Sequence, residues 1–439
     1  MDIIAAVIVL SVLVFVHELG HFLAAKWCRV YVEKFSIGFG PKLYGKKHGE
    51  TEYAISAFPL GGYVKMYGES SDDDYDPSKE GRSFTDKSAW QKAMIILAGP
   101  VFNVLFAVII FWFLYIIGIP SHSPVIGQVE TGSPAETAGL KEGDRIASVN
   151  GRNIKSWGEF SEIVAESGGK DIHISLADGR TADISVSEKE VDDIFGGKEK
   201  IGYIGAGLLI EPVIGEVMPD MPAERAGLKK GDRILSLDGV PMSSWSMSAE
   251  YIRSRPEKAI SVTVERGGKA MDDIVITPQL SEQGAGEDKE QVGLIGISAY
   301  EGDVIVRYGP IAAMKLGLEK SYEITKLIYM GFVKLAERAI PADSLGGPIL
   351  IVQTAAQSAD SGIMTLLIFM AAISINLAVF NLLPIPVLDG GQLVIIIAEG
   401  VMGRKLGEKA LGAFQMFGFF IIMSLMVFAF YNDIMRIIR

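Results

Sequence analysis

Hydrophobic residues gather in four long runs that carry almost no charge. The runs cover residues 1–25, 94–118, 363–388 and 411–431. Each is long enough to cross about 30 Å of hydrocarbon as a helix, because a helix rises about 1.5 Å per residue. The pattern therefore predicts a polytopic α-helical membrane protein with four transmembrane helices.

The segments between these runs have other patterns. Residues 26–93 contain short strand-like stretches separated by Gly and Pro, followed by an acidic stretch from Glu69 to Glu80. We expect a cytoplasmic, membrane-associated β region that ends in a solvated loop. Residues 389–410 are expected to form a cytoplasmic loop. The long segment after the second run has the mixed composition of a water-exposed domain.

That long segment contains an internal repeat. Pro-Ala-Glu at 134–136 returns at 222–224, and Gly-Asp-Arg-Ile at 143–146 returns at 231–234, so the copies are 88 residues apart. A fixed offset of this kind indicates a duplicated fold.

The repeat predicts two tandem domains, over residues 122–208 and 209–300. Residues 301–362 follow them and include an amphipathic stretch with several Lys residues. We expect this stretch to lie as a helix on the membrane interface.

Basic residues predict the orientation. Residues 26–92 carry eleven Lys and Arg, and the loop before the fourth run carries three more, whereas none precedes the first run. Both loops are therefore expected in the cytoplasm and the insert outside. Arg436 and Arg439 would then lie outside, which is a mild conflict with the rule.

Three ionisable residues lie together in the first apolar run. His17 and His21 are four residues apart, so a helix places both imidazoles on one face, where they can bind one metal ion. Glu18 follows the first histidine and can act as general base toward water at the metal. A chance match or a signal peptide is the alternative. However, a charged group at the bilayer centre costs about 2.5–3.5 kcal/mol and marks a functional site by default.

A catalytic zinc usually has three protein ligands, so a third is needed. Asp389, just after the third run, is the acid nearest to an apolar core, and helix parity places it in the same cytoplasmic leaflet as the two histidines. Pro384 and Pro386 interrupt helical hydrogen bonding and let the chain turn back. The alternative is a helix-ending turn with a capping Asp.

Three asparagines lie within the apolar runs, where an unpaired amide is costly. Asn376 and Asn381 belong to the third run and Asn103 to the second. Each could simply bond a neighbouring helix. The functional alternative is that Asn376 and Asn381 hold the substrate backbone, while an amide such as Asn103 supports the oxyanion.

These motifs resemble the site-2 protease family of intramembrane zinc metalloproteases. The resemblance rests on His-Glu-Leu-Gly-His at 17–21 and on the Asn-x-x-Pro-x-Pro-x-Leu-Asp-Gly pattern at 381–390, and shorter matches extend it over nearly the whole chain. It implies that Zn²⁺ is bound by His17, His21 and Asp389 and that Glu18 is the catalytic acid/base. Gln392 stands where many members have His, which puts only a helper role there in doubt.

The resemblance also implies the biological setting. The repeated domains resemble bacterial PDZ domains, an α+β fold that binds peptide or protein termini, or that would here exclude bulky substrates. Substrates would be single-span membrane proteins, such as a trimmed anti-sigma factor or signal-peptide remnants, cleaved in the sigma-E extracytoplasmic stress response. The chain would lie in the bacterial inner membrane, with the PDZ domains periplasmic and the active site toward the cytoplasmic leaflet.

Composition narrows the remaining classes. The net charge of −12 argues against nucleic acid and against an anionic lipid surface as the main partner. A hydrophobic content of 49% is consistent with membrane lipid as the surroundings of the helices. Two alternatives are a non-enzymatic PDZ scaffold or chaperone, which would tolerate loss of Glu18, and a zinc transporter, which would need a continuous polar path.

Overall fold

A computed structural model describes residues 2–69, 76–192, 197–283, 290–300, 302–337 and 346–438. The chain divides into two compact units. The membrane unit comprises Met1–Ile117 and Tyr308–Arg439, and the insert unit comprises Gly118–Arg307. Part of the expected acidic loop, residues 70–75, lies outside the described residues.

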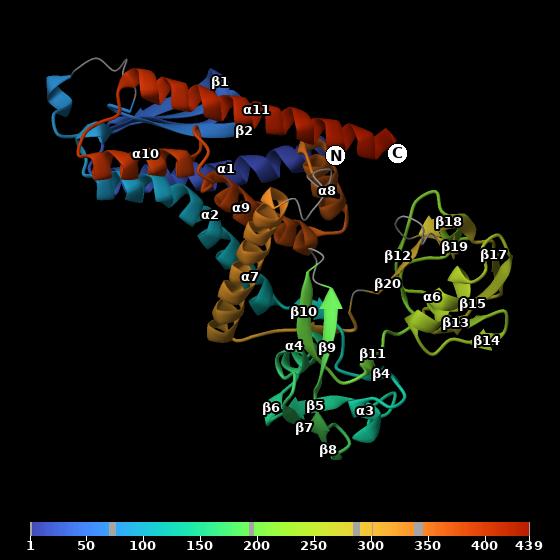
Figure 1. The fold of residues 1–439 in the computed structure, drawn as a ribbon. Helices are drawn as coiled ribbons and strands as arrows, with labels where there is room; N and C mark the ends of the chain where they lie inside the picture. The colour runs from blue at the N-terminus through green and yellow to red at the C-terminus, as the bar shows by residue number, and fades with distance from the viewer. Residues whose placement is uncertain are drawn as a thin grey trace. The chain divides into compact units, whose positions relative to one another are not determined.

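Four helices in the described part of the chain are long and apolar enough to cross a membrane. They are α1 (Asp2–Trp27), α2 (Ala89–Ile117), α9 (Ile363–Asn381) and α11 (Glu408–Ile438) (Figure 1). One helix lies in each predicted run. However, α9 ends at Asn381 and not at 388, because the prolines of the following turn cannot continue the helical hydrogen bonds.

The segment expected as a loop over 389–410 is mostly helical. Helix α10 (Asp389–Met402) begins at the carboxylate of the ligand motif and ends before Gly403, which has a φ of 66°. Glycine adopts this left-handed conformation at little cost and so ends the helix. The predicted cytoplasmic loop concerns the side of the membrane and stays a prediction. The helix itself was not foreseen, because a stretch of this length is too short to span a membrane and hydropathy gives no other sign of it.

An antiparallel sheet lies against α1. Its strands β1 (Val32–His48) and β2 (Thr51–Met66) are long and bent, so the stretch 32–37 pairs on one side with 62–66 and on the other with 52–55. The short strands expected from the sequence are thus parts of two long ones. The stretch 62–66 forms one edge of the sheet.

Two further helices complete the membrane unit. Helix α7 (Pro310–Ala336) packs against α2 through buried small residues. A Cβ on Gly317 would lie 3.1 Å from the backbone nitrogen of Trp112. Helix α8 (Pro348–Asp360) is capped by α11, since Asp433 accepts hydrogen bonds from the N–H groups of Gly347 and Ile349, both at 2.9 Å. The cap connects α8 to the last helix.

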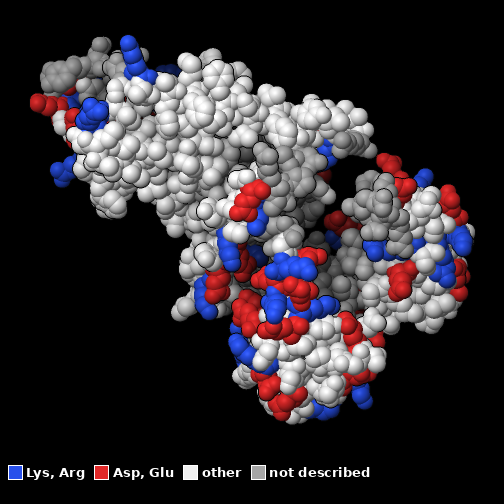
Figure 2. Space-filling model, viewed as in Figure 1, with Lys and Arg blue, Asp and Glu red and all other residues white. Residues whose placement is uncertain are grey.

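The insert unit contains two separate hydrophobic cores. Ile126, Leu140 and Ile146 in the first core correspond to residues 214, 228 and 234 in the second, at the offset of 88. The repeat in the sequence therefore reappears as two equivalent cores. Figure 2 shows that, on the face in view, charged side chains are crowded over this unit and sparse over most of the membrane unit.

Each core is enclosed by short strands and two helices. The first copy contains β4 (Ile126–Val129), α3 (Pro134–Thr137), β5 (Ile146–Val149), β6 (Arg152–Asn153), α4 (Trp157–Glu166), β7 (Asp171–Leu176), β8 (Thr181–Ser185), β9 (Ser187–Asp192), β10 (Lys198–Tyr203) and β11 (Ala206–Leu208). The second contains β12 (Ile214–Val217), α5 (Pro222–Arg225), β13 (Arg233–Leu237), β14 (Val240–Pro241), α6 (Trp245–Arg253), β15 (Ile260–Arg266), β16 (Lys269–Ala270), β17 (Ile274–Ile276), β18 (Gln279–Gln283), β19 (Glu290–Leu294) and β20 (Ile297–Ala299). Sheets of the order β6-β5-β7-β8 and β14-β13-β15-β16 form the centre of each copy.

The two ends of the insert pair with each other. Strand β3 (Ile119–Ser121) is antiparallel to β21 (Val304–Val306), with Ser121 opposite Val304. The chain therefore enters and leaves the insert through one short pair of antiparallel strands.

Candidate active site

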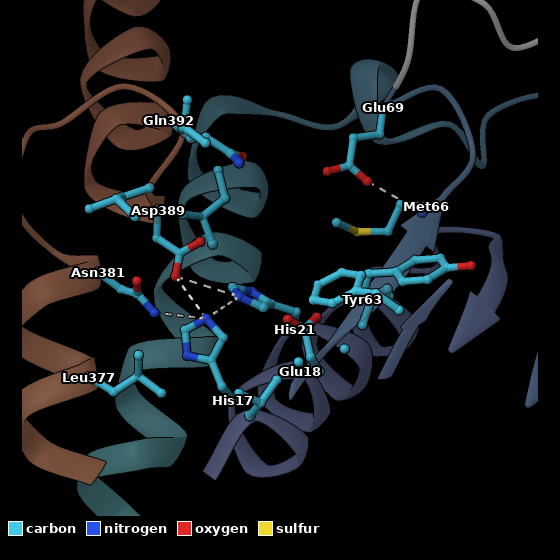
Figure 3. Close-up of a pocket in the computed structure, with 18 residues that line it drawn as sticks. His17, Glu18, His21, Tyr63, Met66, Glu69, Leu377, Asn381, Asp389 and Gln392 are labelled. Carbon is cyan, nitrogen blue, oxygen red and sulfur yellow. Dashed lines mark hydrogen bonds and ion pairs between the residues drawn. The ribbon is translucent and has the colours of Figure 1, made fainter. Parts of the chain in front are cut away.

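Three side chains from two distant segments meet at the middle of the membrane unit. His17 and His21 lie one turn apart on α1, with their Nε2 atoms 3.2 Å from each other. Asp389 Oδ2 lies 3.2 Å from the first of these atoms and 3.6 Å from the second. The ligand atoms of all three residues lie within 4.8 Å of one another (Figure 3).

The turn between α9 and α10 places the carboxylate. Val387 has a φ of 86°, a conformation that is costly for a β-branched residue and that reorients the chain just before Asp389. A Cβ on Gly390 would lie 2.3 Å from the Leu382 carbonyl oxygen, so only glycine lets the start of α10 fold onto this turn. Asp389 therefore projects toward α1.

The three donors fit a zinc ion. The Oδ2 atom of Asp389 is buried and accepts no hydrogen bond from the described residues, although it faces both imidazoles. Both histidines are also buried, at 7% and 9% exposure. Two imidazoles and one carboxylate whose lone pairs converge are a typical donor set for catalytic zinc. A cation at this point would satisfy the orphaned oxygen.

Glu18 lies beside the ligands in a cavity of about 450 Å³. Val64 on the edge of the sheet lines the same cavity. Gly62 leaves space for the Glu18 side chain, since a Cβ there would lie 3.3 Å from Glu18 Cγ. The cavity is thus bounded by α1 on one side and by the sheet edge, with Tyr63 and Met66, on another (Figure 3).

The predicted asparagines are placed differently from one another. Asn381 lines the cavity, and its Nδ2 lies 3.3 Å from His17 Nε2. Asn103 is fully buried behind His17, with Nδ2 3.3 Å from the Nδ1 atom of that ring, and it does not line the cavity. Asn376 is half-buried and does not line it either.

The two prolines lie in the turn that carries the carboxylate. Pro384 is exposed, whereas Pro386 is buried. A Cβ on Gly418 of α11 would lie 2.1 Å from the Pro386 carbonyl oxygen, so the last helix packs directly on this turn.

Sequence reasoning missed a glycine that makes the site possible. A Cβ on Gly99 of α2 would lie 2.3 Å from His21 Nε2 and 2.8 Å from His17 Cε1. The signal in the sequence was a Gly-Pro pair in the middle of an apolar run, which disfavours a regular helix without a packing reason.

The comparisons with known proteins agree over nearly the whole chain. Residues 5–425 match the model of peptidase family M50. The regulator of sigma-E protease RseP of Escherichia coli (strain K12) is 34% identical over 454 residues, which cover 99% of each chain. A protein of Pasteurella multocida (strain Pm70) whose name describes a zinc metalloprotease is 36% identical over 446 residues. The match covers 98% of each chain.

A solved structure was also found to be similar to a part of the chain. The PDZ domain of an SdrC-like protein from Listeria monocytogenes is 25% identical over 20% of this chain and 84% of its own, with a TM-score of 0.16. The apolar helices, the match over the whole chain and the named relatives give one conclusion: this chain belongs to peptidase family M50, the site-2 protease family, and is a membrane zinc metalloprotease.

Proposed function

We propose that this protease cleaves single-span membrane proteins within the bilayer, with Zn²⁺ held by His17, His21 and Asp389. The observation that supports this most strongly is the meeting of these three ligands beside Glu18, with both histidines and Glu18 on a helix that is apolar enough to span a membrane. Isolated charges in such helices are costly, so their convergence calls for a functional reason.

The residues around the zinc position have separate tasks. Bound zinc supplies a Lewis acid that polarises the scissile carbonyl and acidifies water. Glu18 takes a proton from the attacking water and passes it to the leaving amine. Asn381, at the rim of the cavity, donates to the substrate backbone and holds it in line. Asn376 is half-buried and is not among the described residues that line the cavity, so the same task stays a prediction for it.

The edge of the sheet offers a way to hold an unwound substrate. A transmembrane helix hides its carbonyl groups in hydrogen bonds four residues apart, so it must be extended before cleavage. Residues 62–66 form an edge strand beside Glu18. A substrate strand that pairs with this edge would lie across the cavity.

Cysteine cross-linking tests this pairing. In a Cys28→Ser, Glu18→Gln background, a cysteine at Lys65 should form disulfides with alternate positions of a reporter segment, because strand neighbours repeat every two residues. Cross-links with a period near four would show that the segment stays helical and would contradict the pairing.

The membrane position follows from charge. We propose a multi-pass protein of the bacterial inner membrane, since basic residues concentrate in the loops after the first and third runs. The cavity then opens toward the cytoplasmic leaflet, and the insert unit is periplasmic.

The insert is proposed to consist of two PDZ domains. Each copy has its own core, and a groove of about 290 Å³ in the second is lined by residues of α6 and of the Gly-Leu-Ile-Gly segment before β20. Such a groove is suited to an extended chain end. The Escherichia coli relative is named a regulator of sigma-E protease, and we propose for this chain a trimmed anti-sigma factor as the natural substrate, in a sigma-E stress response.

A single substitution tests the enzymatic proposal. Glu18→Gln removes the proton acceptor but keeps the shape, so cleavage of a membrane reporter should fall by about 10²–10⁴-fold while zinc stays bound. Cleavage at the rate of the unmodified protein would contradict the role of Glu18 and favour a scaffold or chaperone. The exposed helix glycine variant Gly400→Ala serves as a control for handling of the purified protein.

A further inference from the structure

Both imidazoles of the metal site turn their second ring nitrogen toward α2. His21 Nδ1 lies 2.9 Å from the carbonyl oxygen of Ile95. Because a carbonyl oxygen only accepts, this nitrogen carries the hydrogen, and Nε2 keeps the free lone pair that a metal requires. The backbone of α2 thus holds His21 in the metal-binding tautomer.

His17 meets a side-chain amide at the corresponding place. Its Nδ1 atom lies 3.3 Å from Nδ2 of Asn103, which is fully buried. In this orientation the amide NH₂ donates, so Nδ1 accepts and Nε2 would carry the hydrogen, which would point at the ligand cluster and at the Nδ2 atom of Asn381, 3.3 Å away. That is the wrong tautomer for a metal ligand. The amide oxygen of Asn103 meanwhile has no hydrogen-bond partner in the part of the chain that the structure describes.

A half-turn of the amide reverses the situation, because its oxygen and nitrogen occupy nearly the same volume. We propose that Asn103 is a positioning residue that accepts a hydrogen bond from His17 Nδ1–H through Oδ1 and so leaves Nε2 free for zinc. This inference rests on the proposed function, since it requires zinc at His17. Asn103 then acts through the ligand and touches neither substrate nor zinc.

The arrangement of α2 supports a dedicated role. Ile95, Gly99 and Asn103 follow one another at intervals of four, so they lie along one face of the helix. Ile95 offers its backbone carbonyl oxygen to His21, Gly99 leaves space for the two imidazole rings, and Asn103 offers its amide oxygen to His17. The Ser374 hydroxyl of α9, itself fully buried, donates to the backbone oxygen of Asn103 at 2.8 Å and fixes the helix at this level.

Zinc affinity of the purified full-length protein, measured by competition with a chromophoric chelator, tests the proposal. Asn103→Leu removes the acceptor and should lower the affinity about 10–100-fold, the usual cost of losing an outer-shell partner. Asn103→Asp has acceptors only, so it should bind zinc about as tightly as the unmodified protein. If Asp lowered the affinity as much as Leu, Asn103 would be a donor and the proposal would be overturned.

Controls separate this role from folding. Ser374→Ala removes the hydrogen bond to the backbone of Asn103 but leaves the amide, so zinc affinity should persist. Thermal unfolding of the zinc-free forms detects a variant that fails to fold, and Asn103→Ala then replaces Leu as the variant without an acceptor. Undiminished zinc affinity of a folded Asn103→Ala would also overturn the proposal. If the unmodified protein bound no zinc, the proposed function itself would fail.

Discussion

At the scale of single residues, the site depends as much on small side chains as on ligands. Helical spacing made His17, Glu18 and His21 predictable, because four residues on a helix always bring two side chains to one face. The role of Gly99 was not predictable, since it depends on how closely α2 approaches the two rings. The contacts of the Nδ1 atoms of the two histidines were not predictable either, because their partners lie on a different helix.

Gly99→Ala should therefore disturb zinc binding although all three ligand residues are kept. The new methyl group would have to displace one or both imidazoles, and we expect zinc affinity to fall about tenfold or more. Gly400→Ala is the matched control, because a Cβ there meets no atom within 4 Å and should change nothing. Equal zinc affinity of both variants, measured by chelator competition, would show that the helices separate freely at this point.

At the scale of elements, repeats and periodicity were informative and turns were not. The 88-residue offset predicted two domains because equivalent core positions must be apolar in both copies. Pro384 and Pro386 predicted a break in the third run, but not that α9 ends as early as Asn381 or that helix α10 follows, since a Pro-rich turn within an apolar run keeps the hydropathy of a longer helix. The edge strand beside Glu18 depends on a bend in β2 that no local pattern encodes.

Within the second copy, one ion pair between a buried carboxylate and a partly exposed guanidinium should control local stability. Asp232 is 0% exposed and accepts two hydrogen bonds from Arg266, both at 2.7 Å. Breaking such a pair costs about 3 kcal/mol, so Asp232→Asn should lower the hydrogen-exchange protection of β13 and β15 about a hundredfold. Glu211→Gln breaks the exposed pair with Arg233 in the same copy and should cost less than about 1 kcal/mol. Unchanged protection in Asp232→Asn would contradict a stabilising pair.

The same pair predicts the direction of the pH dependence. Burial raises the pKa of Asp232. The hydrogen bonds from Arg266 and from the Lys229 backbone lower it by more than burial raises it, so the pKa lies below its ordinary value. A carboxyl group with a lowered pKa in the folded state stabilises above its ordinary pKa of about 3.9 and loses this contribution as the pH falls through the folded value. In exchange experiments over that acidic range, protection should decrease in the unmodified protein and change less in Asp232→Asn.

At the scale of the whole molecule, the chain combines an apolar catalytic unit with a charged insert. The insert begins and ends in one short pair of antiparallel strands. Hydropathy and the repeat predicted this division, and the sequence could not show that the insert begins and ends in paired strands. That pairing has a practical consequence. Ser121 lies opposite Val304, so the intervening residues can be replaced by a two-residue Asn-Gly turn of the kind that closes antiparallel hairpins.

Such a deletion separates two roles of the proposed PDZ domains. If they exclude bulky substrates, the shortened protein should cleave an untrimmed reporter with a large outer domain as readily as the trimmed one. Loss of cleavage of both reporters would show that the domains are needed to bind substrate. The same deletion with Glu18→Gln should cleave neither reporter and controls for other proteases.

Zinc binding by purified full-length protein, with and without Asp389→Ala, tests the central claim most directly. The unmodified protein should bind one zinc ion, and Asp389→Ala should lower the affinity by about 10²-fold or more, because one of three protein ligands is lost. Glu18→Gln, measured in parallel, should keep its zinc. If Asp389→Ala bound zinc as tightly as the unmodified protein, the metal site would not be the one formed by His17, His21 and Asp389.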